Sequence, residues 1–283
     1  MKKIHGLYLI TLGMIQMIAP QRSLLWTPCW ASPQPFQVVL DPGHGGSDEG
    51  TVYESGQFRV AEKTITLALA KRVEKLLKTR GYRVALTRSD DREVPLAART
   101  QLANQLKARV FISIHLNSSD LLGSQDAEGV ETYILNSTTD ASSRRLSQLE
   151  NSVISADPKN PTELDVALIL KDLRLDANLG DSKRLACTLQ NHLVSATSQT
   201  SSLNRKRRNR GVKQALFHVL LGADMPSVLV ETGFLKNPYD RALFMSHSGQ
   251  NRIAQAIVEA IESYQKQMKS GASKSAWTHC PQS

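Results

Sequence analysis

The sequence predicts an α/β fold: a single domain with a mostly parallel or mixed twisted sheet and helices on both faces. From residue 36 onward, short apolar runs rich in β-branched residues alternate with longer segments whose apolar residues recur at helical spacing. The 283 residues are enough for one large domain with a buried core. A composition of 41% hydrophobic and 22% charged residues excludes a disordered acidic chain or a collagen-like repeat.

Each element is predicted from its own pattern. The helix at 62–80 repeats apolar residues at Ile65, Leu69 and Val73 and stops at Gly81, a residue typical of helix C-termini. The strand at 109–115 is almost continuously apolar, which predicts a central place in the sheet. The predicted strands are residues 36–40, 82–87, 109–115, 130–135, 216–220 and 227–231, and the other predicted helices are 95–108, 182–198 and 249–268. The polar stretch at 41–61 is predicted to be a long functional loop.

The N-terminus has the pattern of a secretory signal peptide. Lys2 and Lys3 precede an apolar run at residues 6–19, which is shorter than the about 20 residues that a transmembrane helix needs. We therefore interpret residues 1–31 as a signal peptide and expect no stable membrane span, with an uncleaved anchor as the alternative. The domain is then expected to cover residues 32–268, and residues 269–283 read as a loose tail.

The chain has only three cysteines. Cys29 would leave with the signal peptide, Cys187 lies in a helical pattern, and Cys280 lies in the polar tail. Whether Cys187 and Cys280 form a disulfide is left open by the sequence. Because no cluster of thiolates is available, a bound metal has to be held by imidazole and carboxylate groups.

The formal net charge of +9 favours an anionic partner such as nucleic acid, a membrane surface or an acidic cell-wall polymer. The basic run at 205–210 (RKRRNR) suggests nucleic acid, but a secreted protein meets little of it, and no aromatic residue interrupts the run to stack on bases. We therefore expect no nucleic-acid partner. The run is interpreted as a solvated loop, with attraction to anionic glycans or lipid headgroups as the alternative.

Three residues that can bind a metal stand at the boundaries of predicted elements. His44 follows the first strand, Glu62 begins the first helix, and His115 ends a central strand. Because strand ends and helix starts meet at one edge of such a sheet, these side chains are expected to converge there. Two imidazoles and one carboxylate leave the fourth tetrahedral position of Zn²⁺ open for water. Taken singly, each residue also fits an ordinary role in a turn, at a helix start or at a strand end.

Glu231 stands at the end of another apolar strand, after residues 228–230 (VLV). A carboxylate at the end of a buried strand needs a partner, because its burial is otherwise costly. Next to a zinc-bound water it can act as a general base, so we predict that Glu231 is the catalytic residue.

Four stretches of the sequence resemble the signature blocks of the zinc-dependent N-acetylmuramoyl-L-alanine amidases, the cell-wall amidases of the periplasmic cell-separation type. They are residues 39–46 (VLDPGHGG), 62–63 (EK), 113–117 (SIHLN) and 226–234 (PSVLVETGF), in the family's order, and the resemblance covers about residues 36–265.

The resemblance implies a role for each candidate residue: His44, Glu62 and His115 bind zinc, and Glu231 is catalytic. It also implies that the enzyme cleaves the amide bond between N-acetylmuramic acid and L-alanine of the peptidoglycan stem peptide, in the periplasm, during cell-wall remodelling and cell separation. The stretch between His44 and Glu62 is longer than the common family pattern, which leaves Glu54 as a weaker alternative to Glu62.

Residues 136–181 are predicted to be an inserted segment, for which the resemblance suggests a regulatory role. In some relatives, a helix inserted at this place blocks the zinc cleft with a glutamate until an activator of the LytM-like class displaces it. Residues 146–151 (LSQLEN) look like the start of that helix, so Glu150 is the candidate plug. The following stretch departs from the relatives' glycine-containing pattern, and the alternative is that Glu150 is an exposed helical residue. Asn117 either orients the substrate or metal, or is a turn residue.

Two other classes of function remain at this point. One is another zinc peptidase or deacylase that acts on free peptides, which the released products would distinguish from an amidase. The other is a catalytically silent wall-binding or activator protein, which would be expected to lack a ligand or Glu231. The sequence keeps all four residues.

Overall fold

The computed structural model describes residues 38–118, 127–152, 162–198, 208–270 and 280, without the side chains of residues 162–177. The predicted signal peptide (1–31), most of the tail and the first part of the basic run therefore lie outside the described residues. The described residues all belong to one unit of the chain, Pro35–Ser283.

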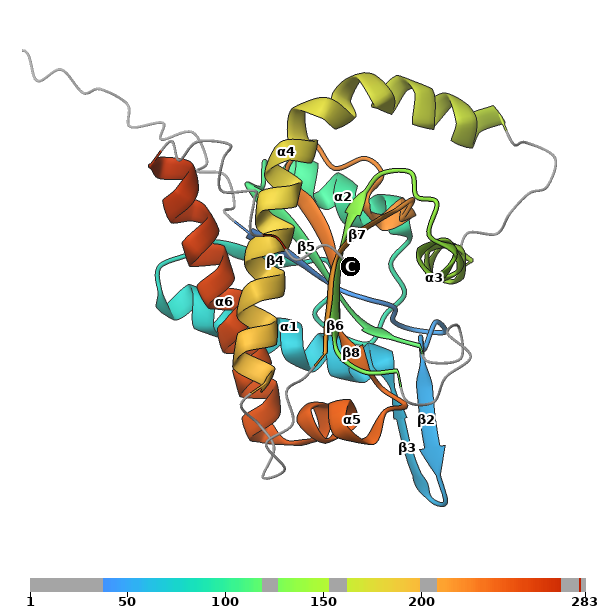
Figure 1. The fold of residues 1–283 in the computed structure, drawn as a ribbon, viewed down its shortest axis with the longest axis vertical. Coiled ribbons are helices and arrows are strands. Elements are labelled where there is room, and N and C mark those ends of the chain that lie inside the picture. Colours follow the sequence, from blue (N-terminus) through green and yellow to red (C-terminus); the bar gives the residue numbers. More distant parts are fainter. Residues whose placement is uncertain (1–37, 119–126, 153–161, 199–207, 271–279, 281–283) are drawn as a thin grey trace, which may run out of the picture. The chain divides into compact units, whose positions relative to one another are not determined.

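A mixed six-stranded sheet forms the centre of this unit (Figure 1). Its order is β4-β1-β5-β8-β6-β7, and all neighbours are parallel except β6 and β8, which are antiparallel. The strands are β1 (Val38–Pro42), β4 (Val84–Leu86), β5 (Val110–Asn117), β6 (Val130–Leu135), β7 (Asn209–Ala215) and β8 (Ser227–Phe234). The predicted fold class is confirmed.

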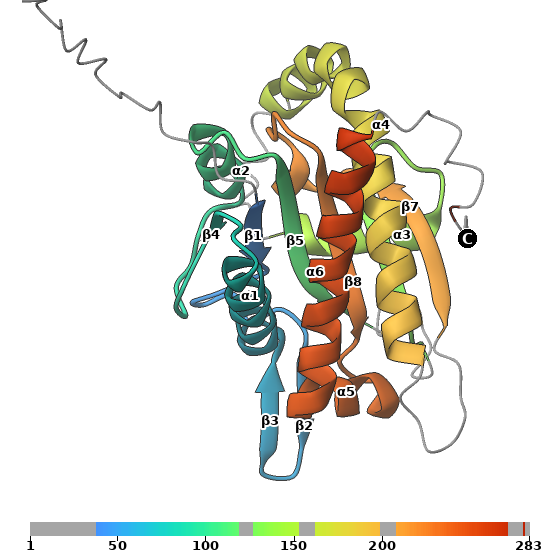
Figure 2. The same cartoon turned by 90° about the vertical axis from the view of Figure 1, so that its left-hand side faces the viewer.

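Helices cover both faces of the sheet (Figure 2). They are α1 (Glu62–Thr79), α2 (Leu96–Gln105), α3 (Ala141–Asn151), α4 (Thr162–Ser198), α5 (Pro238–Met245) and α6 (His247–Lys269), with a short 3₁₀ helix η2 at His218–Leu220. The helices α1, α4 and α6 pack on one face, and α2, α3 and η2 pack on the other. Side chains alternate accordingly along the strands: Leu40 joins the first core cluster, and its neighbour Val39 joins the second.

The strand directions bring several functional side chains to one edge of the sheet. His115 of β5 is in register with Glu231 of β8, and Glu231 lies directly opposite Glu131 of the antiparallel strand β6. Residues that are paired across neighbouring strands point to the same face. The three side chains therefore lie in a row on the face that α2 and α3 cover.

The predicted strand at 216–220 is wrong. The strand is β7, Asn209–Ala215, and residues 218–220 form the 3₁₀ helix η2. The apolar residues that suggested a strand, Phe217, Val219 and Leu220, are buried in the core cluster beneath α2 and α3. The strand β7 lies at the edge of the sheet and carries mostly polar side chains. Its sequence therefore lacks the apolar pattern from which a strand is predicted.

A β-hairpin and a helix were not predicted. The stretch at 41–61, predicted as a loop, contains a β-hairpin whose strands are β2 (Val52–Ser55) and β3 (Phe58–Ala61). The helix α5 begins after Asn237, whose side chain accepts hydrogen bonds from two backbone N–H groups of the first turn, and Pro238 occupies a first-turn position. Both elements are short, so they carry little periodic signal.

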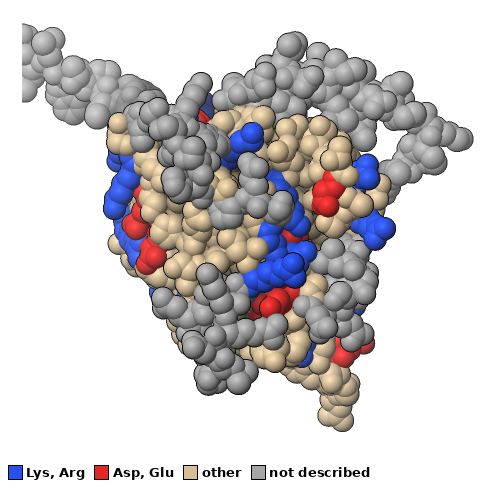
Figure 3. All heavy atoms as spheres, viewed as in Figure 1, with Lys and Arg blue, Asp and Glu red and all other residues tan. Residues whose placement is uncertain are grey.

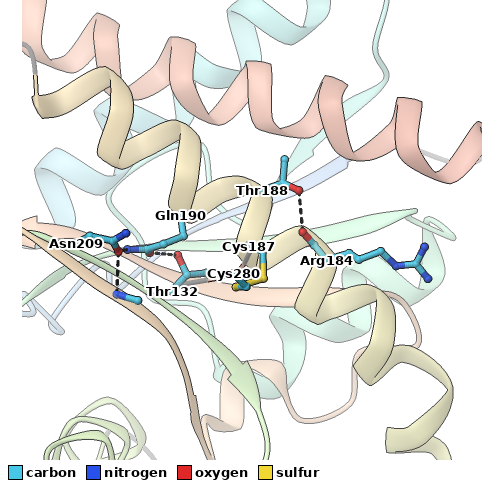
Figure 4. Close-up of a disulfide and its surroundings, with 8 residues drawn as sticks. Thr132, Arg184, Cys187, Thr188, Gln190, Asn209 and Cys280 are labelled. Atoms are coloured by element: carbon cyan, nitrogen blue, oxygen red, sulfur yellow. Dashed lines mark hydrogen bonds between the residues drawn. A yellow bond between two sulfur atoms is a disulfide. The ribbon is translucent and has the colours of Figure 1, made fainter. Parts of the chain in front are cut away.

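The two remaining cysteines are paired. Cys187 of α4 forms a disulfide with Cys280, which answers the question that the sequence left open (Figure 4). One turn further along α4, Gln190 accepts a hydrogen bond from Thr132 and donates to the backbone carbonyl of Val130. The disulfide therefore connects residue 280 to the part of α4 that is fastened to β6.

Candidate active site

The turn after β1 places His44 at the edge of the sheet. His44 has a φ of 60°, a left-handed conformation that is unusual for a residue other than glycine. Its glycine neighbours leave room for the other side chains: a Cβ on Gly43 would lie 2.5 Å from the His115 ring, and one on Gly50 would lie 2.5 Å from the His44 ring. The glycines of this segment therefore allow the two imidazoles to approach each other.

Two buried arginines hold this turn in place. Arg88 donates to the backbone carbonyl of Gly43 (2.7 Å), and Arg99 donates to that of His44 (3.0 Å). Arg99 also forms an ion pair with Asp41 at 2.8 Å, and both side chains are almost completely buried. Burial alone would raise the pKa of Asp41, but Arg99 and two hydroxyl hydrogen bonds hold it below its ordinary value.

The three predicted ligands converge. Glu62 Oε1 lies 3.1 Å from His44 Nε2 and 3.2 Å from His115 Nδ1. A fourth group, Glu150 Oε2, lies 3.5 Å from His44 Nε2 and 3.2 Å from His115 Nδ1. The two imidazole nitrogens are buried and have no hydrogen-bond partner among the described residues. Each of the two nitrogens therefore lies within 3.5 Å of both carboxylate oxygens.

This arrangement fits a tetrahedral zinc ion. Zinc–ligand distances of about 2.0–2.1 Å give a tetrahedron with edges of about 3.3 Å, close to the four separations between the imidazole and carboxylate atoms. Imidazole nitrogens with carboxylate oxygens are also a donor set that zinc accepts. His44, Glu62 and His115 form one of the groups of side chains that are close enough to hold a metal.

Hydrogen bonds from neighbouring residues orient the candidate metal ligands. Asp48 Oδ2 lies 2.8 Å from His44 Nδ1, which leaves Nε2 facing the site. Glu62 accepts backbone N–H bonds from Leu116 (2.8 Å) and Thr51 (2.9 Å). Burial opposes ionisation of Glu62, but the two histidines outweigh it and hold its pKa well below the ordinary range. Glu62 is therefore ionised, as a ligand has to be.

The alternative ligand Glu54 lies elsewhere. Its side chain is 62% exposed on the β2–β3 hairpin, where it forms an ion pair with Arg59 at 2.6 Å. The structure therefore brings Glu62, and not Glu54, to the two histidines.

Glu231 lies beside this group and is completely buried. Neither of its carboxyl oxygens has a hydrogen-bond partner among the described residues, and it lies close enough to His115 and Glu150 to share a metal with them. Burial raises the pKa of Glu231 well above its ordinary value, although His115 opposes the shift. A carboxyl group in this setting is suited to holding and releasing a proton.

The helix α3 closes the site. Glu150 is buried next to the two histidines, so that it occupies the position opposite Glu62. Burial would lower the pKa of His115, but Glu150 and Glu62 raise it to about 10 with no metal bound. The remaining cavity among the site residues has a volume of only about 10 Å³, room for little more than one water molecule. A substrate has no room here while α3 stays in place.

Sequence reasoning missed a buried polar cluster next to Glu231. Glu131 is 2% exposed and accepts hydrogen bonds from Arg210 (2.8 Å), Lys213 (2.7 Å), Tyr133 (2.9 Å) and the amide of Asn117. A glutamate inside the apolar strand at 130–135 was the available signal, because a buried carboxylate requires partners. Asn117 faces this cluster rather than an exposed turn.

Basic side chains are not spread evenly over the face that Figure 3 shows. Figure 3 shows Lys and Arg gathered in the middle of the viewed face, with Asp and Glu close by. The formal charge of +9 therefore does not form one uninterrupted basic surface on this face. Among the described residues, no helix is both long and apolar enough to cross a bilayer.

Known proteins are similar to this chain in sequence and fold. The family described as N-acetylmuramoyl-L-alanine amidase (Amidase_3) matches residues 38–263. The N-acetylmuramoyl-L-alanine amidase AmiA of Escherichia coli K12 is 33% identical over 92% of this chain and 89% of its own length. AmiC of Neisseria meningitidis serogroup B is 34% identical over 80% of this chain, which spans about half (52%) of that relative.

A solved structure agrees with these relatives. The catalytic domain of CwlV, an N-acetylmuramoyl-L-alanine amidase from Bacillus (Paenibacillus) polymyxa var. colistinus, is 32% identical with a TM-score of 0.59. The match covers 82% of this chain and 98% of that domain.

The fold and the relatives together define the class of protein, a peptidoglycan hydrolase of the amidase type. The chain belongs to the Amidase_3 family of N-acetylmuramoyl-L-alanine amidases. The resemblance seen in the sequence is therefore confirmed, and the enzyme is an amidase rather than a silent wall-binding protein.

Proposed function

We propose that this amidase depends on zinc held by His44, Glu62 and His115, and that it cleaves the bond between N-acetylmuramic acid and L-alanine with Glu231 as the catalytic residue. The observation that carries the proposal is the convergence of two imidazole nitrogens, which have no hydrogen-bond partner among the described residues, on one ionised carboxylate oxygen at 3.1 and 3.2 Å. A zinc ion held there supplies Lewis acidity, which polarises an amide carbonyl and makes water more acidic.

The residues of the chain supply the remaining functions. Asp48 and the backbone N–H groups of Thr51 and Leu116 fix the orientation of the ligands, so that little reorganisation is needed during the reaction. The unpartnered carboxyl group of Glu231 accepts the proton of the attacking water and passes it to the leaving nitrogen. With α3 in place, Glu231 is completely buried and is shielded from bulk water.

We further propose that α3 is autoinhibitory and that a LytM-like activator protein displaces it. The support is the place of Glu150 beside both histidines and the small volume left in the site. A helix that fills the site has to move before a peptidoglycan strand can enter. An equilibrium that favours the closed form by a few kcal/mol keeps most molecules inactive.

The same proposal includes a periplasmic location and a role in cell separation. The signal-like residues 1–31 support export, although they lie outside the described residues. The disulfide between Cys187 and Cys280 is consistent with an oxidising compartment. A fusion of residues 1–31 to a reporter that works only outside the cytoplasm tests the location. Loss of cell-chain separation in a deletion strain, restored by the wild-type gene, tests the role.

Digestion of purified sacculi tests the enzymatic proposal most directly. The enzyme is used either as wild type together with its activator or as the Glu150→Ala variant alone. Each preparation is assayed first with a chelator present and then again after zinc has been restored. We expect intact stem peptides that begin with L-alanine to be released only when zinc is present, as measured by mass analysis.

Two results would contradict the proposal. Equal release of peptides with and without a chelator, in protein shown to be metal-free, would exclude zinc dependence. Fragments cut within the stem peptide would instead identify a peptidase. A preparation that is both Glu150→Ala and Glu231→Gln serves as the inactive control.

A further inference from the structure

The buried carboxylate of Glu131 holds two cationic side chains at the edge of the site. Both Arg210 Nε and Lys213 Nζ donate to the same oxygen, Glu131 Oε2. Burial would raise the pKa of Glu131, but Lys213 and Arg210 outweigh it and lower the pKa below its ordinary value. Glu131 is therefore ionised, and one negative charge faces two positive charges.

The two cations keep unused hydrogen-bond donors. Among the described residues, Arg210 donates from its side chain only through Nε, and Lys213 donates only to Glu131. Four N–H groups of the guanidinium and two of the ammonium are left. The two side chains remain 14% and 11% exposed even with α3 in place, so neither is completely buried in the core.

The position of the cations relative to Glu231 follows from the sheet. They belong to β7, two strands away from β8, and neighbouring strands are about 4.8 Å apart. Their backbones therefore lie about 10 Å from that of Glu231, and their long side chains reach back toward Glu131, which is directly opposite Glu231. The charged ends meet at Glu131, whose backbone is one strand spacing of about 4.8 Å from that of Glu231. A peptide residue spans about 3.5 Å, so this shorter distance corresponds to the residue that follows the one at the cleaved bond.

The closed form already places an anion near this spot. Asp140 begins α3 and accepts hydrogen bonds from Ser142 and Ser143. Although burial opposes the shift, these bonds and the nearby charge of Lys213 lower the pKa of Asp140 to about 2. Asp140 and Lys213 line the same cavity, so a displacement of α3 that carries Asp140 along would take a negative charge away from Lys213.

We propose that Arg210 and Lys213, held in place by Glu131, form a subsite for a carboxylate on the peptide residue that follows L-alanine in the substrate. The inference rests on the proposed function, because it assumes that the peptide side of the cleaved bond lies over β6 and β7. Paired cationic donors recognise a carboxylate better than a neutral amide, since hydrogen bonds between charged groups are about twice as strong. The subsite would select acidic stem peptides.

Two synthetic substrates test the subsite. Both are N-acetylmuramoyl-L-alanyl-γ-D-glutamyl methylamides, and they differ only in whether the α-carboxyl group is free or amidated. The assay uses the full chain with the Glu150→Ala substitution, which is expected to open the site. In this variant we expect kcat/KM to be at least about tenfold higher for the substrate with the free carboxylate than for the amidated one. Adding Lys213→Gln or Arg210→Gln should reduce that ratio several-fold. Arg208→Gln removes an exposed positive charge from the same segment and should leave the ratio unchanged.

The ratio of kcat/KM for the two substrates separates recognition of the carboxylate from a merely structural role. A variant whose fold is loosened would cleave both substrates more slowly, so that the ratio would not change. The melting temperature shows which variants are folded. A folded variant with either Lys213→Gln or Arg210→Gln is sufficient for the test. A ratio near one in the opened enzyme, or a ratio that neither substitution changes, would overturn the subsite.

Failure of the proposed function has a different signature. If the opened enzyme cleaves neither substrate, the amidase mechanism is wrong. Equilibrium binding of the same two compounds to the Glu150→Ala, Glu231→Gln double variant then decides the subsite. Preferential binding of the free carboxylate that Lys213→Gln abolishes supports it, and equal binding contradicts it.

Discussion

The two sides of the site are built very differently. The floor consists of β1, α1 and β5, and its ligands are fixed by buried groups such as Arg99, which holds both Asp41 and the backbone of the metal-binding turn. The cover is α3, an 11-residue helix that buries only Ser143, Leu146, Ser147 and Glu150. The floor is part of the core, whereas the cover rests on it.

This difference indicates which side can move. Burial of Leu146 contributes about 1.5–3 kcal/mol, and each neutral hydrogen bond adds about 0.5–1.5 kcal/mol. Asn151, the last residue of α3, makes two such bonds, to the carbonyl of Leu216 and the N–H of His218. These contacts contribute a few kcal/mol to the attachment of α3, and the ion pairs of Glu150 with the two histidines add to them. Elements that move during function belong to this low-stability class.

The largest effects on activity are expected from substitutions at the metal ligands and the catalytic residue of the floor. His115→Ala should lose zinc and all measurable turnover, because two remaining ligands cannot complete the site. Glu231→Gln should keep zinc and lower turnover by about 10²–10⁴-fold, since it removes only proton transfer. Metal analysis after dialysis, together with peptide release from sacculi, distinguishes the two variants. A fully zinc-loaded His115→Ala protein would show that the floor has been assigned wrongly.

The rigidity of the floor is tested at Arg99. Arg99→Met leaves the buried carboxylate of Asp41 without its cation, and breaking such a pair costs about 3–5 kcal/mol of unfolding free energy. Denaturant unfolding in a chelator measures this loss without a contribution from bound zinc. The exposed Arg92 provides the matched control, since Arg92→Met should change stability by less than about 0.5 kcal/mol.

The same pair predicts the sign of a pH effect. The pKa of Asp41 is lower in the folded protein than its ordinary value of 3.8. Its stabilising contribution is therefore fully present above about pH 4 and is lost as the pH falls through the folded pKa. The difference between wild type and Arg99→Met should narrow between pH 7 and pH 3. A difference that stays constant would mean that the charge of Asp41 contributes nothing.

The contrast between the floor and the cover also explains which site residues could be predicted from the sequence. His44, Glu62 and His115 were predictable because each stands at the boundary of a strongly patterned element of the floor. Glu131 was not, because its partners Arg210 and Lys213 come from an edge strand about 80 residues away whose polar pattern hides it. Glu150 was found only through resemblance to relatives, since nothing in an exposed-looking helix indicates that it closes a site.

The cover is tested first at Glu150. Glu150→Ala removes the carboxylate that faces both histidines, so basal activity on sacculi without any activator should rise by about tenfold or more. Gln148 is exposed on the same helix, and Gln148→Ala should leave basal activity unchanged. Equal and high rates in wild type and Glu150→Ala would show that the enzyme is open without an activator.

The smallest effect is expected at the attachment of the cover. Asn151→Ala removes two hydrogen bonds to the segment after β7 but keeps Glu150, so it should destabilise the closed form by about 1 kcal/mol. Basal activity should then rise several-fold, less than in Glu150→Ala, while the zinc content and the rate with a saturating activator stay the same. Hydrogen exchange of the α3 amides should quicken, whereas that of β5 should not. If exchange quickens in both regions, the cover and the floor are one cooperative unit, and the distinction between them is wrong.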